Sequence, residues 1–355
     1  MLLELPVSRK ILTVVAKLDH FQGLFSSQSF IPAERLRRIE EAVRALSVGA
    51  SCRLAGIPVS DSEVAGLLRG ESVPLDDARE ILGYAGALQR NFVPSSGLLG
   101  TRELSELHAE MLGAERPVAP TKWRTERLHR ESFDARGRAT GRVFPTLPHR
   151  LVQTKTEELL TWLEFELRSR EQHPVLVIGG FVLCFLSISP YDRANGRMAR
   201  LLGNLLLRRA GYRAIPYASL EKHMEERRDE HDDAILASQT GLWTEQADLT
   251  PWLDFFLDVL DRHRESVEAK IALERQVHDY PPLQRAILEA VREHGNVGAA
   301  LLLQATGANR NTLKDNLRRL VQRGVLEKTG LRRGTRYRLS CGEQPVTMAR
   351  DASEL

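Results

Sequence analysis

Apolar residues recur along most of this chain at the spacing of a helix face. In the segment 35–47 they fall three or four residues apart, at Leu36, Ile39, Val43 and Leu46, as on the buried side of an amphipathic helix. The stretch 173–188 is nearly all apolar, which is typical of a helix covered on every side. Comparable patterns predict further helices over 76–92, 101–112, 151–168 and 249–264. We therefore expect a mainly α fold.

Local signals refine this pattern at three places. Ser60 is followed three residues later by Glu63, which predicts a capping box at a helix start. The segment 121–148 is rich in Arg, Gly and Pro and includes a β-prone piece at 141–144, which favours a loop with a small hairpin. Residues 191–195 break the apolar helix, and another helix is expected over 196–210. The chain has no repeat of fixed period and no low-complexity tract.

The last quarter of the chain differs in its predicted elements and in its charge. Its pattern predicts helices over 283–294, 297–305 and 309–323, with Gly324 as a C-cap, and strands over 325–328 and 335–339. This order resembles a winged helix-turn-helix. Between positions 310 and 338 there are ten Lys or Arg residues against two acids.

A basic third helix and wing are the electrostatic footprint of a protein that binds duplex DNA. The predicted DNA-binding residues are Arg310, Lys314, Arg318, Arg319, Arg332, Arg333 and Arg336. The alternative is a solvated basic face on a module that binds another protein.

Composition narrows the class of protein. The 355 residues leave room for two or three domains, and 42% hydrophobic with 27% charged residues is ordinary for a soluble chain. No apolar run is long enough to cross a bilayer, and the first residues do not read as a signal peptide. The three cysteines, Cys52, Cys184 and Cys341, are far apart, which suits a reducing compartment. We expect a cytoplasmic protein that has no membrane partner.

The segment from Ser189 to Arg200, SPYDRANGRMAR, is the part of the sequence that is most informative about function. It resembles the signature of the Fic family, HPFx[DE]GN[GK]RxxR, whose members move AMP or another phosphate-containing group from a nucleotide onto a protein hydroxyl. The chain keeps the proline and the aromatic residue, and it also keeps Asn195, Gly196, Arg197 and Arg200. The resemblance implies a Fic-fold helical core with a small β-hairpin.

The resemblance also implies a phosphate site. Helix N-termini attract phosphates, and the loop before the predicted helix would supply Arg193, Ala194, Asn195 and Gly196. Arg197 and Arg200 would pair with the β- and γ-phosphates of ATP, since guanidinium groups bind phosphate oxygens in pairs. The alternative is that the two arginines only cap a helix or form ion pairs.

Two departures from the signature bear on activity. Ser189 stands where the family has its catalytic histidine, and a serine hydroxyl is no base near neutral pH. Losing a general base typically costs about 10²–10⁴ in rate. Arg193 stands where the family has its metal-binding acid, which argues against Mg²⁺ and leaves no predicted metal ligand, although Asp192 lies one residue away.

An inhibitory pattern of the family, [ST]xxxE[GN], is also incomplete here. Ser51 and Gly56 match it, but its glutamate position is Ala55. Either catalysis decayed and the inhibition became useless, or an occupied nucleotide pocket lost its obstruction. The resemblance covers about residues 1–262, including residues 122–124 and a hairpin at 134–146. His223 and His231, in a highly charged segment, are interpreted as a solvated helix face rather than a metal site. The resemblance implies as an alternative that this segment lies near the adenine pocket and lines a ligand site.

Together these observations predict a division into residues 1–95, 96–264, 265–340 and a tail at 341–355. The main hypothesis is a degenerate Fic-domain protein that is impaired in AMP transfer, binds ATP, and acts as a regulator through a DNA-binding winged helix. One alternative is an active protein adenylyltransferase or phosphotransferase with an unusual site. Another is an adaptor that binds proteins. The expected partners are double-stranded DNA, a protein target and a second copy of the chain.

Overall fold

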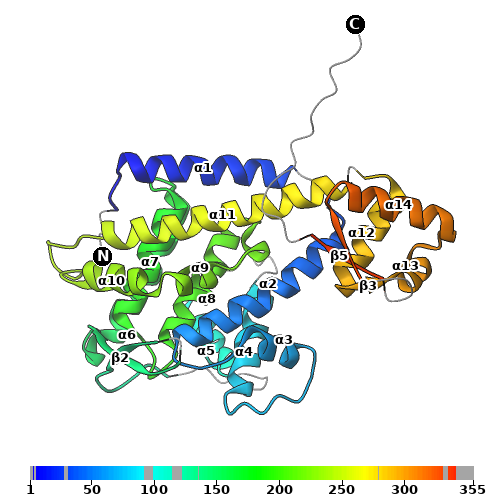
Figure 1. The fold of residues 1–355 in the computed structure, drawn as a ribbon. Coiled ribbons are helices and arrows are strands. Elements are labelled where there is room, and N and C mark those ends of the chain that lie inside the picture. The colour runs from blue at the N-terminus through cyan, green and yellow to red at the C-terminus, as the bar shows by residue number, and fades with distance from the viewer. Residues whose placement is uncertain are drawn as a thin grey trace, which may run out of the picture. The chain divides into compact units, whose positions relative to one another are not determined.

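The computed structural model describes residues 3, 5–27, 31–91, 99–113, 122–134, 136–278, 280–330 and 335–340. They belong to two compact units, Met1–Ala269 and Lys270–Leu355 (Figure 1). Helix dominates the chain, so the expected mainly α class is confirmed. The four-part division stays a prediction, and its boundary at 95/96 lies outside the described residues.

The first unit consists of helices and one two-stranded antiparallel sheet. In order, its elements are α1 (Arg9–Ser26), α2 (Ala33–Leu54), α3 (Asp61–Leu68), α4 (Ala78–Asn91), α5 (Thr101–Met111), β1 (Arg130–Phe133), β2 (Ala139–Phe144), η1 (His149–Leu151), α6 (Val152–Ser169), α7 (Pro174–Ile188), α8 (Asn195–Arg209), η2 (Ile215–Tyr217), α9 (Leu220–Glu226), α10 (Arg228–Gln239) and α11 (Thr250–His278). The boundary between the units falls within α11. The predicted capping box is present, since Ser60 and Glu63 bond reciprocally at the start of α3.

Helix α7 is the centre of the first unit. Every residue from Val175 to Ile188 is buried, as its apolar sequence predicts, and α7 packs against α6 and α8. Gly179 lets α11 come close: a Cβ atom there would lie 2.7 Å from a methyl carbon of Leu253. The indole Nε1 of Trp252 donates to the Gly179 carbonyl at 2.8 Å. The glycine therefore fixes how closely these two helices pack.

Helix α1 was not predicted from the sequence pattern. It lies alongside α11 (Figure 1) and buries Ile11, Leu18 and Phe21. Lys10 pairs with Asp254 at 2.8 Å across this contact. Exposed pairs of this kind contribute little, so the apolar residues account for most of the stability of this contact.

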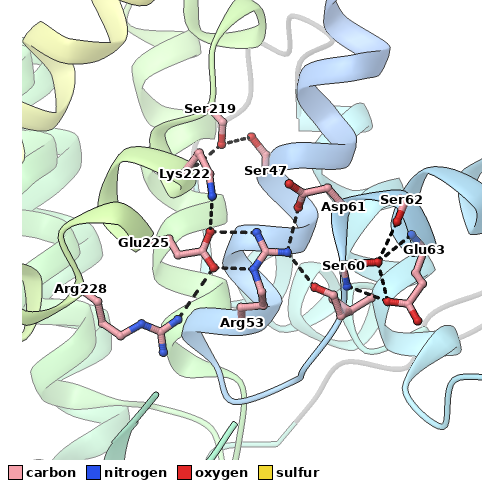
Figure 2. Close-up of polar contacts among 11 residues, drawn as sticks. Ser47, Arg53, Ser60, Asp61, Ser62, Glu63, Ser219, Lys222, Glu225 and Arg228 are labelled. Atoms are coloured by element: carbon pink, nitrogen blue, oxygen red, sulfur yellow. Dashed lines mark hydrogen bonds and ion pairs between the residues drawn. The ribbon is translucent and has the colours of Figure 1, made fainter. Parts of the chain in front are cut away.

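A polar network holds α2 against α9 (Figure 2). Arg53 donates from Nη2 to Glu225 at 2.8 Å and from Nη1 to Asp61 at 2.8 Å. Lys222 also donates to Glu225, at 3.1 Å. Hydrogen bonds to these carboxylates outweigh the effect of burial and raise the pKa of Arg53. The last turn of α2, directly before Ala55, is thus fixed in position.

The second unit contains α12 (Pro282–His294), β3 (Val297–Gly298), α13 (Ala299–Thr306), α14 (Arg310–Gln322), β4 (Leu326–Thr329) and β5 (Arg336–Leu339). The strands form one antiparallel sheet in the order β3-β5-β4. Leucines such as Leu288, Leu302 and Leu317 form a core of its own. The helices and strands predicted for this region are present, and Gly324 ends α14 in the left-handed conformation. The helix predicted from 297 instead starts at Ala299, because Val297 is buried and pairs with Tyr337.

None of the described helices combines the length and the apolar composition that crossing a membrane requires.

Candidate functional site

The loop between α7 and α8 carries the signature residues and has an unusual backbone. Ser189 ends α7 with φ of 45°, and Ala194 precedes α8 with φ of 61°. Residues other than glycine adopt this left-handed region rarely, and such strain gathers at functional sites. The side chain of Asn195 closes the loop, because it accepts from the Tyr191 amide at 3.0 Å and donates to the Tyr191 carbonyl at 2.7 Å.

Aromatic rings hold the loop from the side of α5. Tyr191 stacks on His108, with ring centroids 3.8 Å apart, and on Trp123 at 5.4 Å. His108 Nε2 donates to the Arg193 carbonyl at 3.0 Å. Burial lowers the pKa of His108 to about 4, so the ring is neutral at physiological pH and its protonated nitrogen faces the loop. The histidine therefore acts as a fixed support for the loop.

Arg124 supports the same loop from the other side. Its Nε donates to the Ser189 carbonyl at 2.7 Å and its Nη2 to the Ile188 carbonyl at 3.1 Å. It also bonds to the carbonyls of Glu126 and Leu147. The last carbonyls of a helix have no partner within the helix, and Arg124 supplies one for the end of α7. Its side chain is almost fully buried.

A cavity of about 300 Å³ lies over the loop. It is bounded by the loop and the first turns of α8, by the β1–β2 hairpin, by α10 and by the end of α2. The structure brings most of the predicted site residues to it: Ala55, Arg193, Ala194, Asn195, Gly196, Arg197 and Arg200.

Ser189 does not line the cavity. It is fully buried, and its Oγ donates to the Leu186 carbonyl at 2.7 Å. Ser189, at the position of the family's catalytic histidine, thus directs its side chain to the last turn of α7 and away from the cavity.

The lining of the cavity is rich in cations. It includes Arg130, Arg193, Arg197, Arg200 and Arg228, against the carboxylates of Glu131, Asp192 and Asp232. Burial lowers the pKa of Arg130 to about 10 and also lowers that of Arg200. Poorly solvated guanidinium groups favour an anionic ligand, because a nearby negative charge offsets their lost hydration.

The buried Arg197 has hydrogen-bonding capacity to spare. Its side chain is 5% exposed, and its Nη2 donates to Glu80 Oε2 at 2.6 Å. The other two guanidine nitrogens, Nε and Nη1, are buried and have no hydrogen-bond partner in the described part of the chain. A buried donor without a partner is costly, so Arg197 has hydrogen-bonding capacity that its contact with Glu80 does not use.

Helix α2, in which the incomplete inhibitory pattern begins, contacts Arg200 through Ser51. Arg200 donates from Nε to Ser51 Oγ and from Nη2 to the Ser51 carbonyl, both at 2.8 Å. Ala55 lines the cavity with a methyl group. Position 55 therefore offers Arg200 no carboxylate.

Of the two interpretations of the segment that holds His223 and His231, the solvated face is wrong for His231. His231 is 7% exposed and lines the cavity, so it does not belong to a solvated helix face. Its Nδ1 lies 3.0 Å from Asp232 Oδ1, and Ser132 donates to the other oxygen of Asp232. The spacing of small or apolar residues at 234, 235 and 238, which are buried with position 231, is the signal that identifies this face. Sequence reasoning also missed Arg130, Arg228 and Glu80.

The protein offers Mg²⁺ few ligands at this site. Arg193 is a cation where the metal-binding acid would stand, and it forms an ion pair with Glu80. Asp192 lines the cavity, yet no cluster of three or more His, Cys, Asp or Glu side chains among the described residues is placed to hold a metal ion. Mg²⁺ at phosphate sites is usually held by one or two carboxylates together with phosphates and waters, and Arg193 supplies no such ligand.

The basic residues of the second unit are spread over α14 and β5. Arg310, Lys314, Arg318 and Arg319 are exposed on α14, while Leu313 and Leu317 are buried on its other side. Arg336, on β5, is also exposed. Arg332 and Arg333 lie outside the described residues.

Comparison with known proteins agrees with these features. No family model matches the sequence. Protein adenylyltransferase Fic from Culex quinquefasciatus is 26% identical over 255 residues, which cover 69% of this chain and 46% of that protein. The chain thus spans about half the length of this curated relative.

Two solved structures share the fold. A Fic family protein from Desulfovibrio desulfuricans gives a TM-score of 0.60 at 22% identity, covering 96% of this chain and 98% of the other. A Fic domain containing signaling protein from Bacteroides thetaiotaomicron gives 0.56 at 17% identity, covering 74% and 98%. The expected Fic-type helical core is therefore confirmed.

Proposed function

We propose that this chain, which belongs to the Fic family and is related to protein adenylyltransferases, binds ATP but is impaired in transferring AMP from it. The observation that carries the proposal is the cation-lined cavity from which the side chain at position 189 is excluded. The cavity retains the means to bind phosphates and lacks the group that would activate a hydroxyl.

The binding half of the proposal rests on Arg197, Arg200 and the start of α8. The two arginines line the cavity, and two buried nitrogens of Arg197 have no hydrogen-bond partner among the described residues. Ala194, Asn195 and Gly196 place the first amides of a 15-residue helix at the same cavity. Helix N-termini and guanidinium groups are the usual phosphate ligands in proteins. These residues would therefore hold the phosphates of ATP.

The impairment rests on Ser189 and Arg193. A buried serine whose hydroxyl already donates to a helix carbonyl cannot accept the proton of an incoming hydroxyl, and this loss costs about 10²–10⁴ in rate. Arg193 supplies a positive charge near the phosphates but no metal ligand. Both changes act against transfer and leave binding possible.

Calorimetric titration of ATP into the full chain tests the binding. We expect binding in the presence of a chelator, and a weakening of about 10- to 100-fold in Arg197→Ala, the equivalent of losing charge-assisted hydrogen bonds. Arg102→Ala, at an exposed site in α5, is the matched control and is expected to bind like the natural protein. No binding in either chelator or Mg²⁺ would refute the proposal, as would equal binding by Arg197→Ala.

We also infer that the second unit is a winged helix-turn-helix that binds double-stranded DNA, which would make the protein a regulator. The order α12, β3, α13, α14, β4, β5 among its described residues supports this inference. So does the exposure of the cations on α14, a helix whose leucines are buried on the opposite side. Phosphate contacts of this kind make binding steeply dependent on salt.

Neutralising two cations of α14 tests the DNA interface. Arg318→Ala with Arg319→Ala is expected to weaken binding to a duplex of mixed sequence and to reduce the slope of log K against log salt by about 2, one for each lost phosphate contact. Arg102→Ala with Arg168→Ala, both exposed in the first unit, controls for the change in net charge. If the natural chain does not bind DNA, or the α14 variant binds as well, the protein-binding adaptor is the better hypothesis.

A further inference from the structure

Glu80 lies beside the phosphate site and comes from a distant part of the chain. It is in the first turn of α4 and its side chain is 13% exposed. Its Oε2 accepts from Arg197 Nη2 at 2.6 Å, and its Oε1 pairs with Arg193. One carboxylate thus engages two of the arginines that line the cavity.

Glu80 is an anion in this setting. Burial would raise the pKa of its carboxyl, but the hydrogen bonds and charges of Arg197 and Arg193 outweigh burial and lower the pKa. An ionised carboxylate offers two acceptor oxygens, as a phosphate does, and guanidinium groups bind both in the same way. Glu80 therefore occupies donors that a phosphate group would use.

The pairing with Arg197 is also incomplete. Two of its nitrogens keep no hydrogen-bond partner in the described part of the chain, so a ligand with more oxygens than a carboxylate would satisfy Arg197 better. Arg193 is 62% exposed at its side chain and has room to turn from Glu80 to a ligand. These features describe a contact that a phosphate chain is able to displace.

We propose that Glu80 is an internal competitor for phosphate at Arg193 and Arg197, which lowers the affinity of the site for highly charged ligands. This inference rests on the proposed nucleotide binding. It concerns a different helix and different arginines from the inhibitory pattern, whose acid position is Ala55 and whose arginine, Arg200, is held by Ser51. The competition depends on ligand charge, so it selects among ligands by their phosphates.

Titration of Glu80→Gln tests this role. The substitution keeps the shape of the side chain and removes its charge. In chelator, we expect the full-length variant to bind ATP and inorganic tripolyphosphate at least about 10-fold more tightly than the natural protein, and to bind adenosine equally. Glu103→Gln is the matched control, because Glu103 pairs with Arg209 of the same helix α8 at 2.7 Å but does not line the cavity. Its affinities are expected to be unchanged.

The outcomes separate the two proposals. Unchanged ATP binding by Glu80→Gln would contradict the proposal that Glu80 competes with phosphate. Weaker binding would also contradict it and would indicate that Glu80 positions Arg197. If neither the natural protein nor Glu80→Gln binds ATP, the proposed nucleotide binding is refuted, and this inference is refuted with it. If Glu80→Gln fails to fold, Glu80→Asp is titrated instead, because its shorter side chain moves the carboxylate away from the two arginines. Tighter ATP binding then supports competition by Glu80, and unchanged or weaker binding contradicts it.

Discussion

Replacing Ser189 with histidine and Arg193 with aspartate together is expected to raise transfer of AMP from ATP to a protein hydroxyl by at least about 10²-fold. The double variant restores a general base and a metal-binding acid to a segment whose Asn195, Gly196, Arg197 and Arg200 line the cavity. Mass spectrometry of the protein, incubated with ATP and Mg²⁺, would detect the added AMP as a mass shift. The natural protein is expected to show no such shift under the same conditions.

The backbone favours this gain. Ser189 has φ of 45°, and histidine is among the few residues enriched in that region. Arg193 is 62% exposed, so a carboxylate at this position is able to turn away from Glu80. The backbone therefore permits both substitutions, and the imidazole introduced at the buried position 189 has to turn into the cavity to act as a base.

Two control variants distinguish the contribution of the general base at position 189 from that of the acid at position 193. Ser189→Ala with Arg193→Asp lacks a base and is expected to be inactive, while Ser189→His alone is expected to gain less than the double variant. Labelling by the natural protein at a rate equal to that of the double variant would contradict the impairment. It would favour the alternative hypothesis of a working transferase with an unusual site.

Replacing Arg124 with methionine is expected to destabilise the first unit by about 3–5 kcal/mol. Arg124 supplies donors to four carbonyls, including those of Ile188 and Ser189 at the end of α7. Methionine keeps much of the volume and removes every donor, so buried carbonyls lose their partner. Thermal unfolding is expected to begin about 10 °C lower.

Arg127→Met is the control for this change. Arg127 lies three residues further along the same segment and is exposed, so its loss is expected to be nearly neutral. Equal melting temperatures for the two variants would mean that the loop carbonyls are satisfied in another way. In that case Arg124 would not be what holds the loop.

Features encoded by neighbouring residues were predictable from the sequence. The apolar run predicted the buried helix α7, Ser60 and Glu63 predicted the start of α3, and Gly324 predicted the end of α14. In each case the signal lies within a few residues, where periodicity and capping act. Of the loop residues that the signature identified, Arg193, Ala194, Asn195 and Gly196 line a common cavity, whereas Ser189 does not.

Pairings between distant residues were not predictable in this way. Glu80 and Arg197 are 117 residues apart, and no local pattern connects them. His231 was misinterpreted because the charged residues around it conceal a buried face that continues to Ser238. The cation cluster likewise includes Arg130 from the hairpin and Arg228 from α10, which only the tertiary fold brings together.

The stack of Tyr191 on Trp123 has a practical consequence. Trp162 and Trp252 are buried in the core, whereas Trp123 is half-buried with its ring 5.4 Å from the tyrosine of the signature loop. The fourth indole, Trp243, is also partly buried and donates to Ser187 near the end of α7. A ligand-induced change in tryptophan emission that is lost in Trp123→Phe therefore reports a change at the signature loop without an added label.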